Sequence, residues 1–431
     1  MRTQSHNAAV EFSSGMIPMK QRNNLLVLPL LFLLLAVLPG MGETLQGSLS
    51  NQAASGVPEW GLGPFTRPAA AEPVIKPNPD SIFNCPMRKA PVRWEATHTF
   101  NPAAIVKDGK VYVLYRAEDD IGRGIGGFTS RLGLAFSEDG IHFKTLPEPV
   151  LYPAKDKQSE FEWEGGCEDP RVVETEDGTY VLFYTQYQRT AEPKKRAVLL
   201  GVATSKDLIH WTKLGAVVKG FKGFARKSAS LVCKVAGDRL IAAKINGRYW
   251  LYYGEGAIRL ASTEDFLTWE AEGTLLDQLD EKAVRLRGLD PKHSDPNILL
   301  APRSGKFDAG FPECGPPALL TEKGIVLLYN GKNGMALDDI GLGEKAYSGG
   351  QALFSATDPR KLLDRTDVPF FQPTLPWEKS GQYTQGTTFI EGLVFFKNQW
   401  FLYYGCADTF VGVATAPVQP WQLSALSSTK P

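Results

Sequence analysis

The chain has 431 residues, and its 47 Lys plus Arg are balanced by 47 Asp plus Glu. This balance leaves no overall field to attract nucleic acid or an anionic membrane, so a neutral partner such as a sugar fits better. A hydrophobic content of 43% excludes a mostly disordered chain.

Residues 1–42 are predicted to be a signal peptide. Three basic side chains precede the apolar run 25–38, namely Arg2, Lys20 and Arg22. The run is shorter than the roughly 20 apolar residues that a membrane-spanning helix needs. We therefore expect export to the periplasm or the medium, with no stable membrane span once the segment is removed.

Residues 43–78 are predicted to be a flexible linker, because most of this segment is rich in Gly, Ala, Ser and Pro without hydrophobic periodicity. One catalytic domain is expected over residues 79–424, followed by a disordered tail at 425–431. Within the domain, short β-branched and aromatic runs alternate with Gly, Asp and Asn turns. This pattern is typical of an all-β fold.

A small polar residue, an aspartate and then an aromatic residue recur along the domain. The aspartates are Asp139, Asp207 and Asp265, which lie 68 and then 58 residues apart. Each copy follows a strand of one type, and similar strands at 324–329 and 399–404 lack so clear a partner element. Five such units predict a five-bladed β-propeller, since a closed ring of blades protects the strand edges. We interpret the repeated element itself as a turn and packing device.

No metal site or cofactor is predicted. The five cysteines are widely spread without a Cys-x-x-Cys pair, and the five histidines form no metal-ligand pattern. We interpret the cysteines as small buried side chains, with one disulfide as the alternative in an oxidising compartment.

Four acidic residues at strand ends are candidates for chemistry, namely Asp169, Glu255, Glu313 and Asp408. Glycoside cleavage needs a proton donor and an activator of the attacking group, both usually carboxyl groups. Each residue by itself is more often a turn residue or a surface charge. Their recurrence at two equivalent places in successive units indicates that they meet at one channel mouth.

Basic side chains near these carboxylates are candidates for binding. Arg171 follows Asp169 in the segment Glu-Asp-Pro-Arg. An arginine fork would lower the pKa of an acid catalyst, so we expect Arg171 to orient Asp169, with a structural strand-end pair as the alternative. Lys227 is a further candidate for substrate binding.

Taken in order, these motifs resemble glycoside hydrolase family 130, the mannoside phosphorylases and related β-mannoside hydrolases. The matching segments are 100–102, 115–116, 130–135, 166–171, 315–317 and 403–409. The resemblance implies a five-bladed propeller that acts with inversion on a β-mannoside oligosaccharide. It also implies that Asp169 is the acid and that Asn101, Arg116, Arg131 and Asp408 hold the terminal mannosyl unit.

The chain departs from the phosphorylase pattern at Glu255, where the family's phosphorylases resemble one another in having a histidine of a phosphate-binding cluster. A glutamate would repel a phosphate dianion but could serve as a base for water, and Glu313 adds a second carboxylate. We therefore predict an inverting β-mannosidase in which Glu255 or Glu313 activates water, with Glu255 favoured. The alternatives are a phosphorylase that binds phosphate through Arg226 and Lys227, and a non-catalytic sugar-binding propeller.

Overall fold

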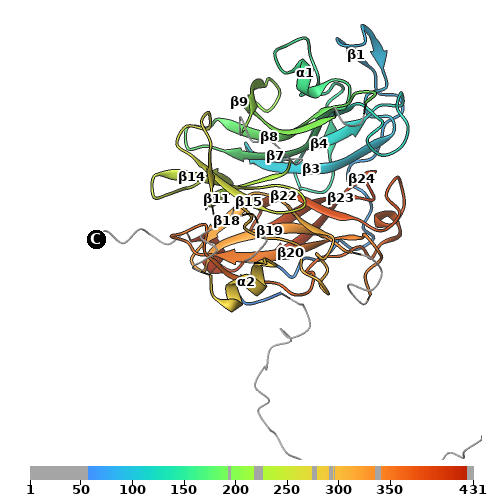
Figure 1. Cartoon of the computed structure of the whole chain (residues 1–431). Coiled ribbons are helices and arrows are strands. Elements are labelled where there is room, and N and C mark those ends of the chain that lie inside the picture. Colours follow the sequence, from blue (N-terminus) through green and yellow to red (C-terminus); the bar gives the residue numbers. More distant parts are fainter. Residues whose placement is uncertain are drawn as a thin grey trace, which may run out of the picture. The chain divides into compact units, whose positions relative to one another are not determined.

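A computed structural model describes most of the chain after residue 56. The described residues are 57–192, 196–217, 227–273, 279–290, 295, 297–334 and 341–424. The predicted signal peptide, the predicted tail and Arg226 lie outside them. The described chain consists almost entirely of strands and loops (Figure 1), so the all-β prediction is confirmed. No helix in this part of the chain has the length and apolar character needed to cross a membrane.

Antiparallel pairing divides most of the described strands into five successive groups. The first contains β3 (His98–Lys107), β4 (Lys110–Glu118), β5 (Ser130–Ser137) and β6 (Lys144–Thr145). The second contains β7 (Gly166–Glu174), β8 (Tyr180–Gln188), β9 (Ala197–Ser205) and β10 (Thr212–Ala216). The third contains β11 (Ala229–Ala236), β12 (Arg239–Ala242), β13 (Lys244–Ile245), β14 (Arg248–Tyr253), β15 (Arg259–Thr263) and β16 (Glu270–Glu272).

The last two groups and the short elements complete the described chain. The fourth group contains β17 (Phe311–Cys314), β18 (Ala318–Thr321), β19 (Gly324–Lys332), β20 (Tyr347–Phe354) and β21 (Leu362–Arg365). The fifth contains β22 (Thr388–Phe396), β23 (Gln399–Cys406) and β24 (Phe410–Pro417). Outside the groups lie β1 (Phe83–Cys85), β2 (Ala90–Val92), α1 (Ser159–Glu162), α2 (Glu281–Arg287), α3 (Pro420–Leu423) and η4 (Pro376–Glu378).

The first strands of the groups lie next to one another. β3 contacts β7 and β22, and β7 contacts β11. β11 in turn pairs in parallel with β18 of the fourth group. In Figure 1 the first two groups, in cyan and green, lie above the orange and red strands of the last two. Residues near the beginnings of these first strands are thereby brought together from distant parts of the sequence.

The N-terminal segment 57–78 belongs to the folded part. Its backbone forms antiparallel bridges with β24, joining Thr66 to Thr415 and Ile75 to Val411. Leu62 is fully buried in a core cluster with side chains of β23 and β24. This corrects the expectation of a flexible linker up to residue 78. The few apolar side chains of the segment are spaced without periodicity, so only the tertiary contacts reveal their burial.

The repeated Asp-aromatic element forms a turn, as predicted. The Asp139 carboxylate accepts hydrogen bonds from the backbone N–H groups of Ile141 and His142. Asp207 and Asp265 accept the equivalent bonds two and three residues further on. The chemistry therefore lies elsewhere.

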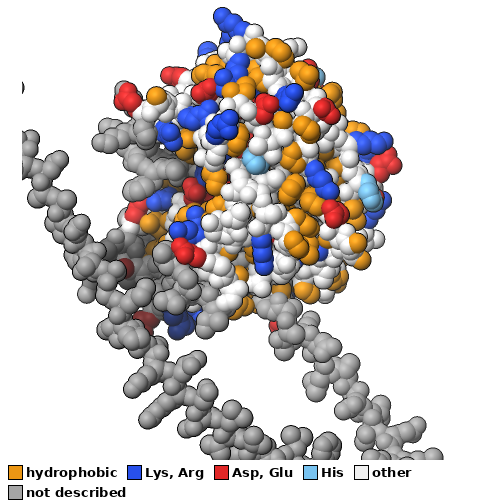
Figure 2. Space-filling view, turned by 90° about the vertical axis from the view of Figure 1, so that its right-hand side faces the viewer, with side chains coloured by type: hydrophobic (Ala, Val, Ile, Leu, Met, Phe, Trp, Pro, Cys, Tyr) orange, Lys and Arg blue, Asp and Glu red, His pale blue; other side chains and the backbone are white. Residues whose placement is uncertain are grey.

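One further prediction is borne out by burial. All five cysteines are buried and unpaired, which confirms their interpretation as small buried side chains. On the face shown in Figure 2, basic and acidic side chains are scattered among one another.

Candidate active site

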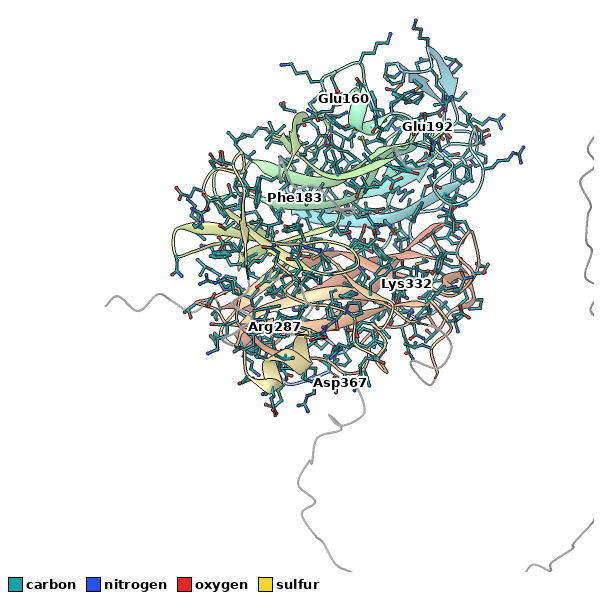
Figure 3. The ribbon with its side chains drawn as sticks, viewed as in Figure 1. Glu160, Phe183, Glu192, Arg287, Lys332 and Asp367 are labelled. Atoms are coloured by element: carbon teal, nitrogen blue, oxygen red, sulfur yellow. The ribbon has the colours of Figure 1, made fainter. Side chains whose placement is uncertain are left out.

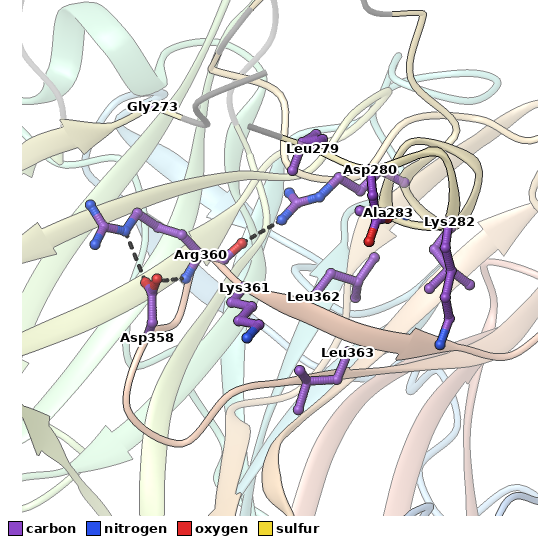
Figure 4. A pocket seen from close by; sticks show the side chains of 12 residues that line it. Gly273, Leu279, Asp280, Lys282, Ala283, Asp358, Arg360, Lys361, Leu362 and Leu363 are labelled. Atoms are coloured by element: carbon purple, nitrogen blue, oxygen red, sulfur yellow. Dashed lines mark hydrogen bonds and ion pairs between the residues drawn. The ribbon is translucent and has the colours of Figure 1, made fainter. Parts of the chain in front are cut away.

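A pocket of about 280 Å³ opens near the beginnings of the first strands. It is lined by seven of the nine predicted site residues: Asn101, Arg116, Asp169, Lys227, Glu255, Glu313 and Asp408. A larger cavity of about 520 Å³ beside α2 (Figure 4) contains none of them. There Arg360 pairs with Asp358 beside leucine side chains. The convergence of charged groups makes the smaller pocket the candidate active site.

Local backbone irregularities aim two of these side chains into the pocket. The β3–β4 register shifts at Asn101 and the β7–β8 register shifts at Asp169, and both residues have left-handed backbone, with φ of 48° and 47°. Such bulges bend the strand and redirect a side chain. A proline follows each residue and lacks an N–H to pair, which favours a break in the ladder there. Gly405 leaves space for the Asn101 side chain, since a Cβ at position 405 would lie 2.3 Å from Asn101 Oδ1.

The Asp169 carboxylate is buried and surrounded by donors. Oδ1 accepts hydrogen bonds from Asn101 Nδ2 at 2.8 Å and from Arg116 Nη1 at 3.1 Å. Oδ2 lies 3.5 Å from the Lys227 ammonium nitrogen. Burial raises the pKa of Asp169, but the charges of Lys227 and Arg116 outweigh burial and hold the pKa below its usual value. Asp169 is therefore ionised in the unliganded protein.

Arg116 gathers three carboxylates at the base of the pocket. Its Nη2 lies 2.7 Å from Glu118 and 2.9 Å from Glu168, while Nη1 contacts Asp169. Burial raises the pKa of Glu168 to about 7 against the opposing charge of Arg116. Burial also raises the pKa of Asp408 to about 6. The pKa values of Glu168 and Asp408 thus lie nearer to neutral pH than the pKa of Asp169.

Lys227 connects Asp169 to the two predicted bases. Its ammonium nitrogen lies 3.5 Å from Glu255 Oε1 and 3.4 Å from Glu313 Oε1. The backbones of the two glutamates form an isolated antiparallel bridge. Glu313 is fully buried and accepts a hydrogen bond from Ser228 Oγ. Burial raises the pKa of Glu313 to about 7, although Lys227 acts in the opposite direction.

Arg171 lies behind the pocket and contacts the backbone of the acid. Its guanidinium donates to the carbonyl oxygens of Asp169 at 3.0 Å and Cys314 at 2.8 Å. It also forms a buried ion pair with Glu391 at 2.8 Å. These contacts suit a group that orients Asp169. Sequence reasoning missed Glu391, although it is the lone charged residue in the apolar strand β22.

Arg131 does not line the pocket, contrary to the prediction. Its guanidinium pairs with Asp119 at 3.0 Å and donates to the carbonyl of Thr129. Successive side chains of a strand point to opposite faces. Its neighbour Ser130 points to the other face, where its hydroxyl accepts from Arg116 and donates to Glu168, two residues that line the pocket. Arg131 is thereby directed into a buried structural ion pair.

Ten further lining residues were not predicted as site residues. They are Phe100, Ile125, Gly126, Glu168, Tyr187, Lys332, Tyr347, Gln382, Tyr383 and Phe389. Glu168 could have been found, because it precedes Asp169 in the same segment. Most of the others come from strand ends and loops whose convergence depends on the tertiary fold. Within the described residues, no three His, Cys, Asp or Glu side chains are grouped as ligands of a metal ion.

Comparisons with known proteins point to one family. The model of the glycoside hydrolase 130 family, described as β-1,4-mannooligosaccharide phosphorylase, matches residues 66–421. A curated 1,2-β-oligomannan phosphorylase from Thermoanaerobacter sp. strain X514 is 33% identical over 76% of this chain and 93% of its own length.

Solved structures agree with this similarity. One comes from work on family 130 glycoside hydrolases that target β-1,2-mannosidic linkages in Candida mannan. It is 44% identical with a TM-score of 0.75, and the match covers 85% of this chain and 99% of the other. A glycosyl hydrolase from Bacteroides ovatus is also 44% identical with a TM-score of 0.75, covering 86% of this chain and 99% of that chain.

Proposed function

Because the chain belongs to glycoside hydrolase family 130, we propose that it is an inverting β-mannosidase that hydrolyses terminal β-mannosides of oligosaccharides. We also propose that the five strand groups are the blades of a five-bladed propeller. The first strands of the groups then surround the pocket, and the N-terminal segment completes the fifth blade by pairing with β24. Closure of this kind leaves no open sheet edge.

The grouping of three carboxylates around Lys227 carries the proposal of hydrolysis. A phosphate dianion beside Lys227 would face the carboxylates of Asp169, Glu255 and Glu313. Two like charges about 4 Å apart repel by about 4 kcal/mol at an effective dielectric constant of about 20. A water molecule is neutral and is not repelled, and a neighbouring carboxylate can accept its proton as it attacks.

In the proposed reaction, Asp169 is the acid, and Asn101, Arg116 and Asp408 hold the terminal mannose. Asp169 must gain a proton when substrate binds. A sugar above the carboxylate excludes water and so favours the neutral form. Glu168, whose pKa is raised by burial to about 7, shares Arg116 with Asp169 and can supply this proton.

Glu313 is better supported than Glu255 as the base for water. Burial raises the pKa of Glu313 to about 7, so this carboxylate takes up a proton readily near neutral pH. The side chain of Glu255 is 27% exposed and lies farther toward solvent. The favoured base thus changes from the one that the sequence suggested.

Phosphorolysis is the second candidate, because a curated phosphorylase is 33% identical and Lys227 offers one cation for phosphate. Incubating the protein with β-1,2- and β-1,4-mannobiose, with and without inorganic phosphate, separates the two reactions. We expect free mannose with no need for phosphate. Phosphate-dependent release of mannose 1-phosphate would overturn the proposal of hydrolysis.

We also propose export, on the basis of the basic and apolar pattern in residues 1–42. Hydrolysis suits this location, because the bond energy that a phosphorylase stores in a sugar phosphate is lost outside the cell. Mass spectrometry of the protein recovered from periplasm and medium tests this point. Only chains that begin after about residue 42 should be found there.

A further inference from the structure

The pocket has a closed base and an open mouth, and the side chains at the mouth are more exposed to solvent than those at the base. Asn101, Asp169 and Glu313 at the base are buried. At the mouth, Lys332 and Tyr383 are half-buried, and Ile125 is exposed. A terminal mannose at the base must therefore direct the rest of the oligosaccharide past the residues of the mouth.

Lys332, which is labelled in Figure 3, lies on the same face of the fourth group as Glu313, two residues farther along the strand pair. In the β17–β19 register, Lys332 is opposite Phe311, and Asn330 is opposite Glu313. Two residues along a strand return to the same face and advance by about 7 Å. A displacement of about 7 Å from Glu313 would bring Lys332 to the sugar next to the terminal mannose, rather than to a second position on the terminal mannose itself.

Aromatic rings from three segments hold the Lys332 side chain in place. Its ammonium nitrogen lies 5.0 Å from the ring centroids of Phe311 and Tyr347, and 5.8 Å from that of Tyr383. Tyr347 is its direct neighbour in β20, and Tyr383 packs edge-on against Tyr347 with a centroid distance of 5.5 Å. Cation–π contacts of this kind fix the position of a side chain that is otherwise flexible.

The Lys332 ammonium group keeps its donors available. Among the described residues it forms no hydrogen bond or ion pair, although it lines the pocket. The nearby carboxylates of Glu255, Glu313 and Asp408 disfavour an anionic ligand. Sugar hydroxyls can accept from the ammonium group, and the apolar face of a pyranose ring can pack on the tyrosines.

We propose that Lys332, Tyr347 and Tyr383 form the subsite that binds the leaving mannose unit, next to the scissile bond on its reducing side. This inference rests on the proposed function, since it assumes that the pocket cleaves a β-mannoside. The ligand class is a neutral pyranose in an oligosaccharide. The subsite residues position the substrate, and they take no part in proton transfer.

The test compares two substrates that differ only in their leaving group, β-1,2-mannobiose and β-mannosyl fluoride. The variants are Lys332→Met and Tyr383→Ala. The matched control is Lys244→Met, which removes an exposed lysine that packs on Tyr249 at 4.9 Å, away from the pocket. Hydrogen bonds to charged groups contribute enough for a roughly tenfold to hundredfold effect on kcat/KM.

We expect Lys332→Met and Tyr383→Ala to lower kcat/KM for mannobiose by at least about tenfold, while activity on the fluoride stays within about twofold of the wild-type value. Retained activity on the fluoride also shows that each variant is folded. An equal loss on both substrates, or no loss on mannobiose, would overturn the subsite. Failure of the wild-type protein to cleave either substrate would instead overturn the proposed function.

Discussion

Asp169 is the residue on which the proposed chemistry depends, and its surroundings set a specific requirement. Arg116, Asn101 and Lys227 stabilise its carboxylate, so the acid form must arise in the complex with substrate. This arrangement differs from a general acid whose pKa is already high in the free enzyme. We propose that the nearby Glu168 supplies the proton, because burial raises its pKa to about 7 and it shares Arg116 with Asp169.

The first prediction concerns Asp169→Asn. The amide keeps the shape of the side chain but cannot donate a carboxyl proton, so we expect kcat on β-1,2-mannobiose to fall by about 10² to 10⁴. Initial rates of mannose release measure the effect. Asp139→Asn, the same change in an exposed turn, serves as the control and should leave kcat unchanged. A fully active Asp169→Asn variant would favour a non-catalytic role for the residue.

The second prediction concerns pH. A general base works only when deprotonated, and burial raises the pKa of Glu313 to about 7. We therefore expect kcat/KM for mannobiose to fall about tenfold per unit as the pH decreases below about 7, and to fall again at higher pH as Glu168, the proposed proton source, loses its proton. Glu255→Gln should keep this acid limb, and Glu313→Gln should abolish turnover. The opposite outcome for the two variants would assign the base to Glu255.

At the scale of elements, the pocket residues and the residues of the repeated turns lie on different strands of each group. The first strands carry the irregular residues, because a bulge frees a side chain from the ladder and turns it toward the pocket. The outer strands carry the repeated Asp-aromatic turns. In the fourth group Ser355 and Asp358 form a similar turn without the aromatic residue, which explains why the repeat is hard to detect there.

The third prediction tests the structural role of the repeated turn. The Asp207 carboxylate accepts hydrogen bonds from the N–H groups of Ile209 and His210. We expect Asp207→Ala to lower the free energy of unfolding by about 1 kcal/mol and to leave kcat unchanged. Denaturant unfolding checks the first value and mannose release the second. Asp238→Ala, at an exposed turn without a side-chain hydrogen bond in the described structure, should alter neither.

At the scale of the whole molecule, the N-terminal segment pairs with the last strand group, so the two ends of the described chain meet in one sheet. Thr66 and Ile75 pair with β24. Arg67 adds a hydrogen-bonded ion pair to buried Glu378 at 2.6 Å. These contacts join residues more than 300 positions apart, so the strand groups are stabilised together.

The fourth prediction compares a protein that begins at residue 57 with one that begins at residue 79. The shorter protein loses buried Leu62, Phe65 and Ile75. Burying each such side chain contributes about 1.5–3 kcal/mol. We expect thermal unfolding at a clearly lower temperature for the shorter protein. Equal unfolding temperatures would show that residues 57–78 contribute little to stability.

The sequence by itself determined the features that depend on neighbouring residues. Strand alternation, the turn aspartates and the Glu-Asp-Pro-Arg segment are local patterns, and they led to the all-β fold, to the role of Asp139 and to Asp169 as the acid candidate. The family resemblance also rests on such segments. Seven of the nine proposed site residues line one pocket, because the start of a first strand and the end of the strand antiparallel to it lie at the same edge of the sheet.

Only the tertiary structure decided which side chains face one another. Arg131 turned away from the pocket because strand register directed Ser130 inward. Glu391 became visible only when β22 was brought next to Arg171, and Lys332 only when its place in the pocket beside Glu313 was known. The physical reason is that burial, charge pairing and pKa depend on distances in space, which spacing along a chain does not specify.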